Sequence, residues 1–274
     1  MTRILSLDDE PGMLELYGLI LGRAGYEYLC TSDDFEAWAI LRSEPVDLFT
    51  QDLMRPIMDG WEFYQEMRAD ETLCGLPILV ITARAKSIDI SAYGDISQVD
   101  GYLCKPFGPN DLLATLQDVL TRRGRRLPTA EEQLRGQERF QQWHGGGQFW
   151  VGTSPTGEAQ TVEALIQALN GEDWKSRWEA AFALGRSKDA QAVGPLVAAL
   201  HDNNSIVRMM AAHALGEIGD KQAVRPLTRV LSDADSWVRR AAAYALRQVT
   251  PPEAKGLSLI HRFIQWVRSL FRRK

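Results

Sequence analysis

Several features that define common protein classes are missing from this sequence. It has only three cysteines, Cys30, Cys74 and Cys104, with no close pair and no metal-ligand spacing. Such a sparse, odd set argues against a disulfide framework and favours a reducing compartment. No apolar run approaches the ~20 residues needed to span a bilayer. The N-terminus, MTRILSLDDE, turns acidic without the apolar core of a signal peptide. We therefore expect a cytoplasmic protein.

Charge is unevenly distributed along the 274 residues, a length that suits about two domains. Residues 1–123 contain 10 Lys and Arg and 21 Asp and Glu, a net charge of −11, which leaves +6 for the remainder. An acidic first part repels phosphate, and no helix-turn-helix module follows it. We therefore expect no nucleic-acid partner.

The first 123 residues alternate short apolar runs with amphipathic stretches. Five such alternations predict a doubly wound α/β domain, an open parallel sheet with helices on both faces. Binding sites in these folds form beyond the carboxyl ends of the strands. Asp8, Asp9 and Asp52 all fall at strand ends, so we expect them to converge. The expected strands are Arg3–Leu7, Tyr26–Thr31, Asp47–Gln51, Pro77–Thr82 and Gly101–Cys104.

Residues 124–157 differ in composition from the segments on either side. Thr129 and Glu132 have the spacing of a capping box, which predicts the start of a polar helix. The segment then becomes rich in glycine and aromatic residues. We interpret it as a linker with one polar helix.

Residues 158–252 contain a repeat with a period of 31 residues. VEALIQAL at 162–169 aligns with VGPLVAAL at 193–200 and VRPLTRVL at 224–231. Each of the three copies predicts a helix–turn–helix pair whose apolar face needs a neighbour, so the copies should stack as an all-α solenoid. Small alanines would allow close approach, and Gly185 and Gly216 are expected to end the second helix of the first two copies.

The arginines Arg177, Arg208 and Arg239 recur in the same repeats. We expect them to bond acidic or carbonyl groups of the adjacent repeat. Asp173, Asp202 and Asp233 are expected to be their partners or to cap helices. A row of arginines that binds phosphate is the alternative.

Four separated motifs in the first 120 residues resemble the response-regulator receiver family. They are LSLDDEP (5–11), QDLMRPIMDGWEF (51–63), VITAR (80–84) and GYLCKPF (101–107). Their order and spacing match that family. The resemblance implies a flavodoxin-like (βα)5 receiver domain over residues 1–123, with Pro106 in the cis form.

The resemblance also implies an Mg²⁺ site and a phosphoacceptor. Asp52 would be the nucleophile that takes a phosphoryl group from a histidine kinase and forms an acyl phosphate. Asp9 and Asp52 would bind Mg²⁺ directly, Asp8 through water, and Met54 through its backbone carbonyl. Clustered carboxylates and a hard cation suit one another, because each neutralises the other.

The remaining motif residues would act on the phosphoryl group. Lys105 would place a cation on its oxygens, Thr82 would hydrogen-bond it, and Tyr102 would swing inward behind it as the switch. Met54 and Arg84 would border the path of attacking water. Arg55 departs from the family, which often has methionine at this position.

The 31-residue pairs resemble HEAT-like repeats, in particular the short type found in phycobilisome lyases. That resemblance implies a surface for a protein partner that the sequence does not identify. Some HEAT-like proteins are metal hydroxylases with His-Glu pairs, but His201, His213 and His261 have no adjacent glutamate. We expect tryptophans Trp174, Trp178 and Trp237 to pack in the core. A surface tryptophan would be a candidate binding hot spot.

The last segment, 255–274, predicts a basic amphipathic helix with six basic and no acidic residues. It would either cap the last repeat or lie on an anionic membrane through residues 257–274. Taken together, the sequence predicts a response regulator of a two-component system that signals by protein binding. It would be no enzyme beyond its own phosphoryl transfer and dephosphorylation. The alternatives are a bilin-lyase-like module under receiver control and a constitutive membrane-surface scaffold whose receiver forms a homodimer.

Overall fold

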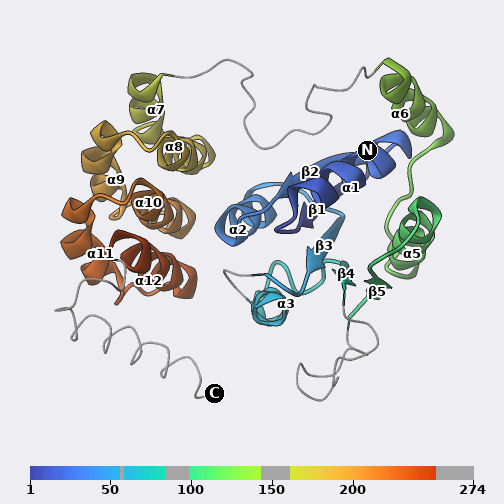
Figure 1. Cartoon of the computed structure of the whole chain (residues 1–274), viewed down its shortest axis with the longest axis horizontal. Coiled ribbons are helices and arrows are strands. Elements are labelled where there is room, and N and C mark those ends of the chain that lie inside the picture. The colour runs from blue at the N-terminus through green and yellow to red at the C-terminus, as the bar shows by residue number, and fades with distance from the viewer. Residues whose placement is uncertain (56–58, 84–98, 143–160, 251–274) are drawn as a thin grey trace. The chain divides into compact units, whose positions relative to one another are not determined.

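The computed structural model of the chain describes residues 1–55, 59–83, 99–142 and 161–250. The chain forms two compact units, Met1–Pro155 and Thr156–Lys274 (Figure 1). The C-terminal helix predicted over 255–274 lies outside the described residues, as does Arg84. Within the described residues, no helix is both long enough and apolar enough to cross a membrane.

The first unit is built on a parallel sheet of five strands in the order β2-β1-β3-β4-β5. The five predicted strands are confirmed to within one residue at each end, and so is the doubly wound α/β fold. Every residue of β3 and β4 is buried, as expected for parallel strands covered on both faces. The strands are β1 (Arg3–Leu7), β2 (Glu27–Thr31), β3 (Leu48–Asp52), β4 (Ile78–Thr82) and β5 (Gly101–Cys104).

Helices cover both faces of this sheet. On one face, α1 (Pro11–Arg23) and α5 (Pro109–Arg122) share a core with side chains of β1, β2, β3 and β4. On the other face lie α2 (Asp34–Ser43) and α3 (Gly60–Ala69), where the Phe63 ring packs 5.9 Å from Trp38 and 5.6 Å from Phe49. Because all five strands run parallel, their carboxyl ends lie at one edge of the sheet, and the candidate site lies at this edge.

A further helix of this unit, α6 (Ala130–Gln142), occupies part of the segment predicted as a linker. The predicted capping box is present, because the Thr129 N–H donates to Glu132 Oε2 at 2.8 Å and the Glu132 N–H donates to Thr129 Oγ1 at 3.3 Å. The helix packs against α1. A Cβ on Gly136 would lie 2.4 Å from the Gly22 carbonyl oxygen, so glycine is needed at this crossing. In the structure α6 is therefore part of the first unit.

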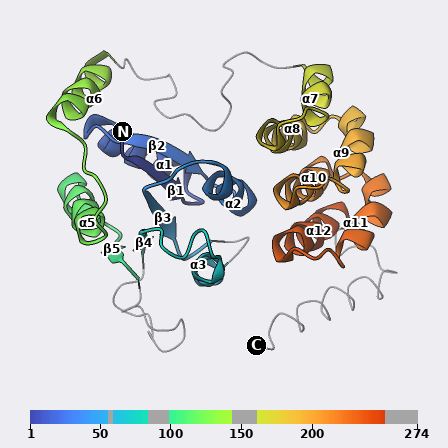
Figure 2. The same cartoon turned by 180° about the vertical axis from the view of Figure 1, so that it is seen from behind.

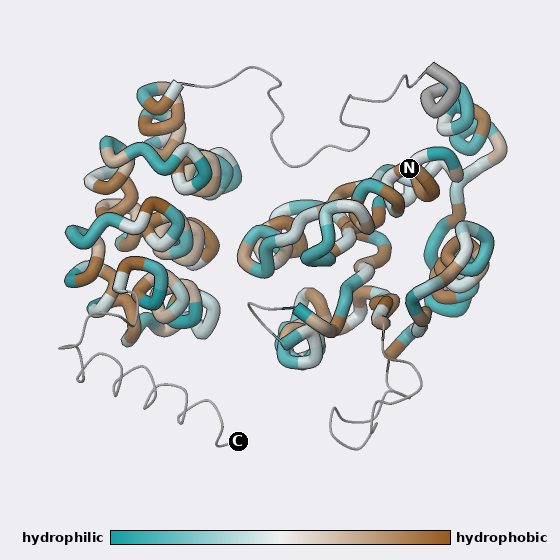
Figure 3. Tube along the Cα trace, viewed as in Figure 1, coloured by the Kyte–Doolittle hydropathy of each residue, from teal (hydrophilic) through white to brown (hydrophobic). Residues whose placement is uncertain are grey.

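The second unit is a stack of three helix pairs, as the period of 31 residues predicts. Figures 1 and 2 show the first helices of the pairs in one row and the second helices in another. Hydrophobic and hydrophilic residues alternate in short blocks along these helices (Figure 3). The pairs are α7 (Val162–Leu169) with α8 (Trp174–Ser187), α9 (Val193–Ala199) with α10 (Ser205–Ile218), and α11 (Val224–Val230) with α12 (Ser236–Val249); the short 3-10 helices η2 (Ala190–Ala192) and η3 (Lys221–Ala223) join them.

One prediction about the repeats is wrong. Gly185 and Gly216 do not end their helices, which continue to Ser187 and Ile218. A Cβ on either glycine would lie within 2.8 Å of backbone and Cβ atoms of the next repeat, at Ala214 and Ala245. These glycines instead allow neighbouring helices to touch.

Two of the three repeated arginines, Arg177 and Arg208, bond the adjacent repeat as predicted, whereas Arg239 donates from Nη1 to the Asp233 and Ala234 carbonyls of its own repeat, each at 2.7 Å. Arg177 donates from Nε and Nη2 to both carboxylate oxygens of Asp202, at 2.8 and 3.0 Å. Arg208 donates in the same way to Asp233, at 2.9 Å for each bond. Asp173 is an N-cap, whose carboxylate accepts from the backbone of α8. We name the two bidentate pairs the arginine ladder.

The tryptophans follow the core prediction in two of three cases. Trp178 and Trp237 are buried, whereas Trp174 at the start of α8 is half-buried. Large apolar side chains of the repeats are therefore used mainly inside the stack.

Candidate functional site

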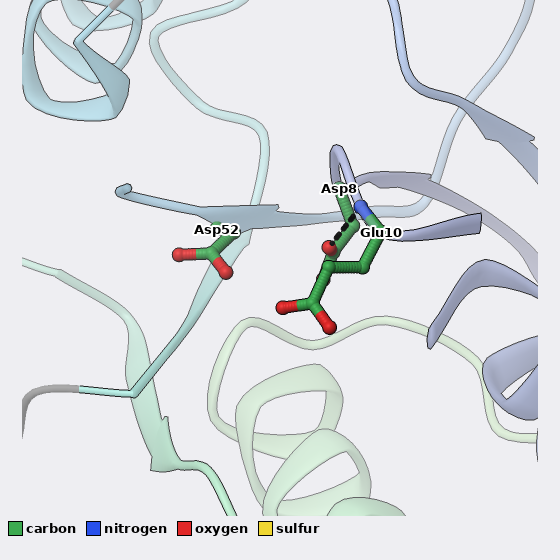
Figure 4. A group of neighbouring side chains, drawn as sticks. All are labelled: Asp8, Glu10 and Asp52. Atoms are coloured by element: carbon green, nitrogen blue, oxygen red, sulfur yellow. Dashed lines mark hydrogen bonds between the residues drawn. The ribbon is translucent and has the colours of Figure 1, made fainter. Parts of the chain in front are cut away.

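The acidic residues at the carboxyl edge of the sheet form a cluster. Asp8 follows β1 and Asp52 ends β3, and these two strands are neighbours paired at Leu7 and Gln51. Carboxylate oxygens of Asp8, Glu10 and Asp52 lie within 4.8 Å of one another. Figure 4 shows Asp8 and Glu10 on the segment after β1 and Asp52 on the adjacent strand. Parallel strand order thus brings together the two aspartates that the sequence predicted.

Asp9, the third predicted acid, is exposed and is not a member of this cluster. Glu10 takes part instead, and sequence analysis did not name it. The Glu10 N–H donates to Asp8 Oδ1 at 3.0 Å, which turns the chain into α1. Glu10 thus contributes the third carboxylate of the cluster.

Lys105 lies between the two buried aspartates. Its Nζ donates to Asp8 Oδ2 and to Asp52 Oδ2, each at 2.8 Å. Burial by itself would lower the pKa of Lys105, but the hydrogen bonds to Asp52 and Asp8 outweigh burial and raise it. Lys105 therefore carries a fixed positive charge beside the predicted acceptor oxygen. The peptide bond from Lys105 to Pro106 is cis, as expected.

Thr82 ends β4 next to Lys105, whose backbone N–H donates to the Thr82 carbonyl at 2.9 Å. The Thr82 side chain is fully buried, and its Oγ1 has no hydrogen-bond partner among the described residues. Buried hydroxyls are normally satisfied. An unsatisfied hydroxyl at the carboxyl end of a strand is available to hydrogen-bond a group that binds from outside the chain.

Met54 lies just beyond the end of β3, and Tyr102 lies on β5. The Met54 N–H donates to Asp52 Oδ1 at 2.9 Å, and its side chain is among the exposed large hydrophobic groups at 42%. Tyr102 is half-buried on β5, opposite Val80 of β4. Burial, assisted by Cys104, raises the pKa of Tyr102, so the phenol stays protonated.

Tyr17 is a site residue that sequence analysis missed. Its hydroxyl donates to Asp8 Oδ2 at 3.1 Å, and its ring stacks on Phe107 at 6.1 Å. Burial and then the negative charge of Asp8 raise the pKa of Tyr17, so it stays a donor. In the sequence, Tyr17 has the spacing of a core residue of α1, and only the fold brings its hydroxyl to Asp8.

The donor set at this edge is hard and oxygen-rich. Three carboxylates that lie this close repel one another unless cations neutralise them. Lys105 supplies one positive charge, and carboxylate oxygens are the ligands that divalent magnesium prefers. The residues therefore fit a bound Mg²⁺ ion.

Comparison with known proteins identifies both parts of the chain. Residues 4–117 match the model of the response regulator receiver domain, and residues 162–254 match that of HEAT repeats. Curated relatives include the DNA-binding dual master transcriptional regulator RpaA of Synechocystis sp., 36% identical over 47% of this chain and 53% of the relative. The phosphate regulon transcriptional regulatory protein PhoB of Pseudomonas aeruginosa is 35% identical over 44% of this chain and 52% of the relative. The chain thus spans about half the length of these curated relatives.

Solved structures also resemble part of the chain. The chemotaxis protein CheY4 of Vibrio cholerae is 33% identical, with a TM-score of 0.41 over 44% of this chain and 99% of that one. The response regulator TrrA of Thermotoga maritima, solved in complex with Mg(2+)-BeF, is 30% identical, with a TM-score of 0.38 over 44% of this chain and all of that one. From the family matches and the sheet topology, this chain joins a response regulator receiver domain of the two-component type to HEAT repeats.

Proposed function

We propose that the protein is a phosphorylation-controlled response regulator whose acceptor is Asp52 and whose output is protein binding by the HEAT repeats. The observation that carries this proposal is the position of Lys105 Nζ, 2.8 Å from both Asp8 and Asp52. That arrangement holds a positive charge where phosphoryl oxygens would gather around the acceptor. A histidine kinase would supply the phosphoryl group, and the receiver would catalyse only its own phosphorylation and dephosphorylation.

Asp8, Glu10 and Asp52 would hold an Mg²⁺ ion, with Asp9 and the Met54 carbonyl as further ligands. When bound, the ion supplies charge neutralisation for the transferring group. The protein's own residues do the remaining work. Lys105 neutralises the phosphoryl oxygens, and Tyr17 keeps the Asp8 carboxylate in place by its hydrogen bond.

Thr82 and Tyr102 would report the phosphorylated state. The unsatisfied Thr82 Oγ1 would donate to the phosphoryl group, and Tyr102 would move inward on the neighbouring strand. The altered face of the receiver would then bind differently, to a second receiver or to another protein. This mechanism needs a two-state element, and β4 and β5 with their site residues are the candidate.

The output would come from the repeats and not from DNA binding. RpaA and PhoB are named transcriptional regulators, but each match covers less than half of this chain. HEAT repeats instead follow the receiver. Stacked helix pairs offer an extended surface to a protein partner. In the described repeats, the arginine ladder uses its charges within the stack, which favours a binding surface over a chemical site.

Beryllium fluoride with Mg²⁺ tests the proposed site, because this mixture mimics an acyl phosphate on aspartate. Amide hydrogen exchange should slow around residues 52–55, 82–83 and 101–107 of the full chain. The same treatment of Asp52→Asn should leave exchange unchanged. Equal exchange with and without beryllium fluoride in the wild type would contradict the proposal.

A further inference from the structure

Arg55 lies three residues after Asp52, at the position where the family often has methionine. It forms an ion pair with Asp34, the first residue of α2, and both side chains are only 1% exposed. Arg55 Nε and Nη2 donate to Asp34 Oδ1 at 3.1 and 2.6 Å. A charged pair this deeply buried is costly to desolvate. Packing alone does not explain this ion pair, because a methionine would fill the same space as Arg55 without a charge.

The third nitrogen of the guanidinium contacts the acceptor itself. Arg55 Nη1 donates to the backbone carbonyl oxygen of Asp52. The Asp52 carboxylate in turn accepts from the Met54 N–H at 2.9 Å. These two bonds hold residues 52–55 together as a compact segment that includes the backbone of the acceptor. The guanidinium also lies 5.5 Å from the centre of the Phe63 ring, on α3.

The 52–55 segment is attached to two helices, α2 and α3. Asp34 ties it to the start of α2, and the Gly60 N–H donates to the Leu53 carbonyl at 3.1 Å, which ties it to the start of α3. A Cβ on Gly60 would lie 2.5 Å from Leu53 Cα, so this contact leaves no room for a larger residue. Residues 52–55 are thus held by fixed elements at both ends.

The ion pair acts by geometry more than by net charge. Burial raises the pKa of Asp34, and the charge of Arg55 offsets part of that shift. Arg55 and Asp34 together are neutral, so they change the total charge around the carboxylate cluster little. Their effect on the site is to fix the backbone that carries the Asp52 carboxylate and the Met54 carbonyl.

We propose that Arg55 is a positioning residue, which fixes the 52–55 backbone through Asp34 and the Asp52 carbonyl and so sets the affinity of the site for Mg²⁺. The proposal rests on the proposed function of Asp52. Groups that orient metal ligands typically change metal affinity by about 10- to 100-fold when they are removed. Lysine cannot replace arginine here, because a single ammonium cannot span the bidentate pair and the carbonyl.

Mg²⁺ affinity of the full chain, measured by calorimetry without any phosphodonor, tests this role. We expect the dissociation constant to rise about tenfold in Arg55→Met and in Arg55→Lys. Arg55→Met leaves Asp34 buried without its partner and can fail to fold. The double variant Asp34→Leu with Arg55→Met removes both charges and should fold, and it should bind Mg²⁺ as weakly as Arg55→Met.

A control variant removes the arginine of another ion pair, at the opposite end of the sheet. Arg68 donates to Asp100 at 2.7 Å, and Asp100 accepts from the N–H of Ile78 at the start of β4. Arg68→Met should lower stability and leave the Mg²⁺ dissociation constant unchanged. A change of less than threefold in the folded double variant, relative to wild type, would overturn the positioning role and leave a purely structural pair. A change of threefold or more, absent in Arg68→Met, supports it.

The two proposals fail in different ways. Wild-type protein that binds Mg²⁺ but takes no phosphoryl group would refute the proposed function and leave the affinity test of Arg55 intact. Wild-type protein that is phosphorylated while the double variant binds Mg²⁺ normally would refute the role of Arg55 alone.

Discussion

Charged side chains are used in opposite ways in the two units of this protein. In the repeats, Arg177 and Arg208 each meet one aspartate of the next repeat, with two hydrogen bonds per pair. In the receiver, three carboxylates share the single ammonium group of Lys105, within 3.6 Å of each carboxylate. Positive and negative charges balance in the first arrangement, whereas negative charge remains in excess in the second.

The difference separates a structural use of charge from a chemical one. A balanced, bidentate pair resists change and fixes the register between repeats. An acidic cluster with excess charge attracts a cation, and the unsatisfied hydroxyl of Thr82 adds a place for a further group. Under the proposed function, the receiver would be the unit that responds, and the repeats would be the unit that presents a surface.

The largest expected effect comes from removing the ammonium group of Lys105. Lys105→Met should slow phosphorylation by acetyl phosphate about 10²- to 10³-fold, because a preorganised charge on the transferring group is lost. Phosphoprotein formed over time, measured by intact mass, checks this rate. The control Lys221→Met, on the exposed start of η3, should react like wild type. Normal phosphorylation of Lys105→Met would show that Lys105 has only a structural role, like the arginines of the arginine ladder.

The arginine ladder should matter for stability and little for phosphorylation. Arg208→Leu removes both bonds to Asp233 and should lower the free energy of unfolding of the repeats by about 2–3 kcal/mol. Urea denaturation followed by circular dichroism measures the loss. Arg225→Leu, at an exposed position of α11, should change it by less than about 0.5 kcal/mol. If Arg208→Leu kept its stability, the alternative of a phosphate-binding arginine row would gain support.

The glycine contacts between repeats should respond to a single methyl group. Gly216→Ala places a Cβ 2.7 Å from Ala245 Cα, and the backbone shift should cost about 1–3 kcal/mol. Gly194→Ala is the matched control, because a Cβ there meets nothing within 4 Å. That change should leave stability equal or raise it by up to about 1 kcal/mol. Equal melting temperatures for the two variants would contradict close packing at Gly216.

Acid should weaken the ladder by a smaller amount. Burial alone would raise the pKa of Asp233, but the hydrogen bonds from Arg208 and from the Asp235 N–H outweigh burial and lower it. A lowered folded-state pKa adds stability above the unfolded value, about 3.9, and that stability is lost as pH falls towards the folded value. The melting temperatures of wild type and Asp233→Asn should therefore converge below about pH 4. A constant difference across this window would argue against a charged pair.

Much of the fold could be predicted from the sequence because its signals are local. Each strand is a short apolar run, and Asp8 and Asp52 directly follow or end such runs. The period of 31 residues predicts that Arg177 and Arg208 face the next repeat. The function of Gly216 could not be predicted, because a glycine near a helix end is more often a cap than a contact. Its partner Ala245 is distant in sequence.

The details of the site depend on tertiary contacts that no motif records. Asp9 and Glu10 are adjacent acids, and only the folded structure shows that Glu10 joins Asp8 and Asp52 in the cluster. Arg55 and Asp34 are 21 residues apart, and Asp34 begins α2 whereas Arg55 lies beyond the end of β3. The docking of α6 depends on Gly136 meeting the end of α1. In each case the sequence shows the residue, but only the folded structure shows which residue it contacts.

The most direct test of the account is the intact mass of the full chain after treatment with acetyl phosphate, with and without Mg²⁺, for wild type and Asp52→Asn. The account predicts one phosphoryl adduct on the wild type that requires Mg²⁺ and is absent from the variant. A folded wild-type protein that gains no adduct, or an equal adduct on Asp52→Asn, would contradict the central claim that Asp52 is the phosphoacceptor.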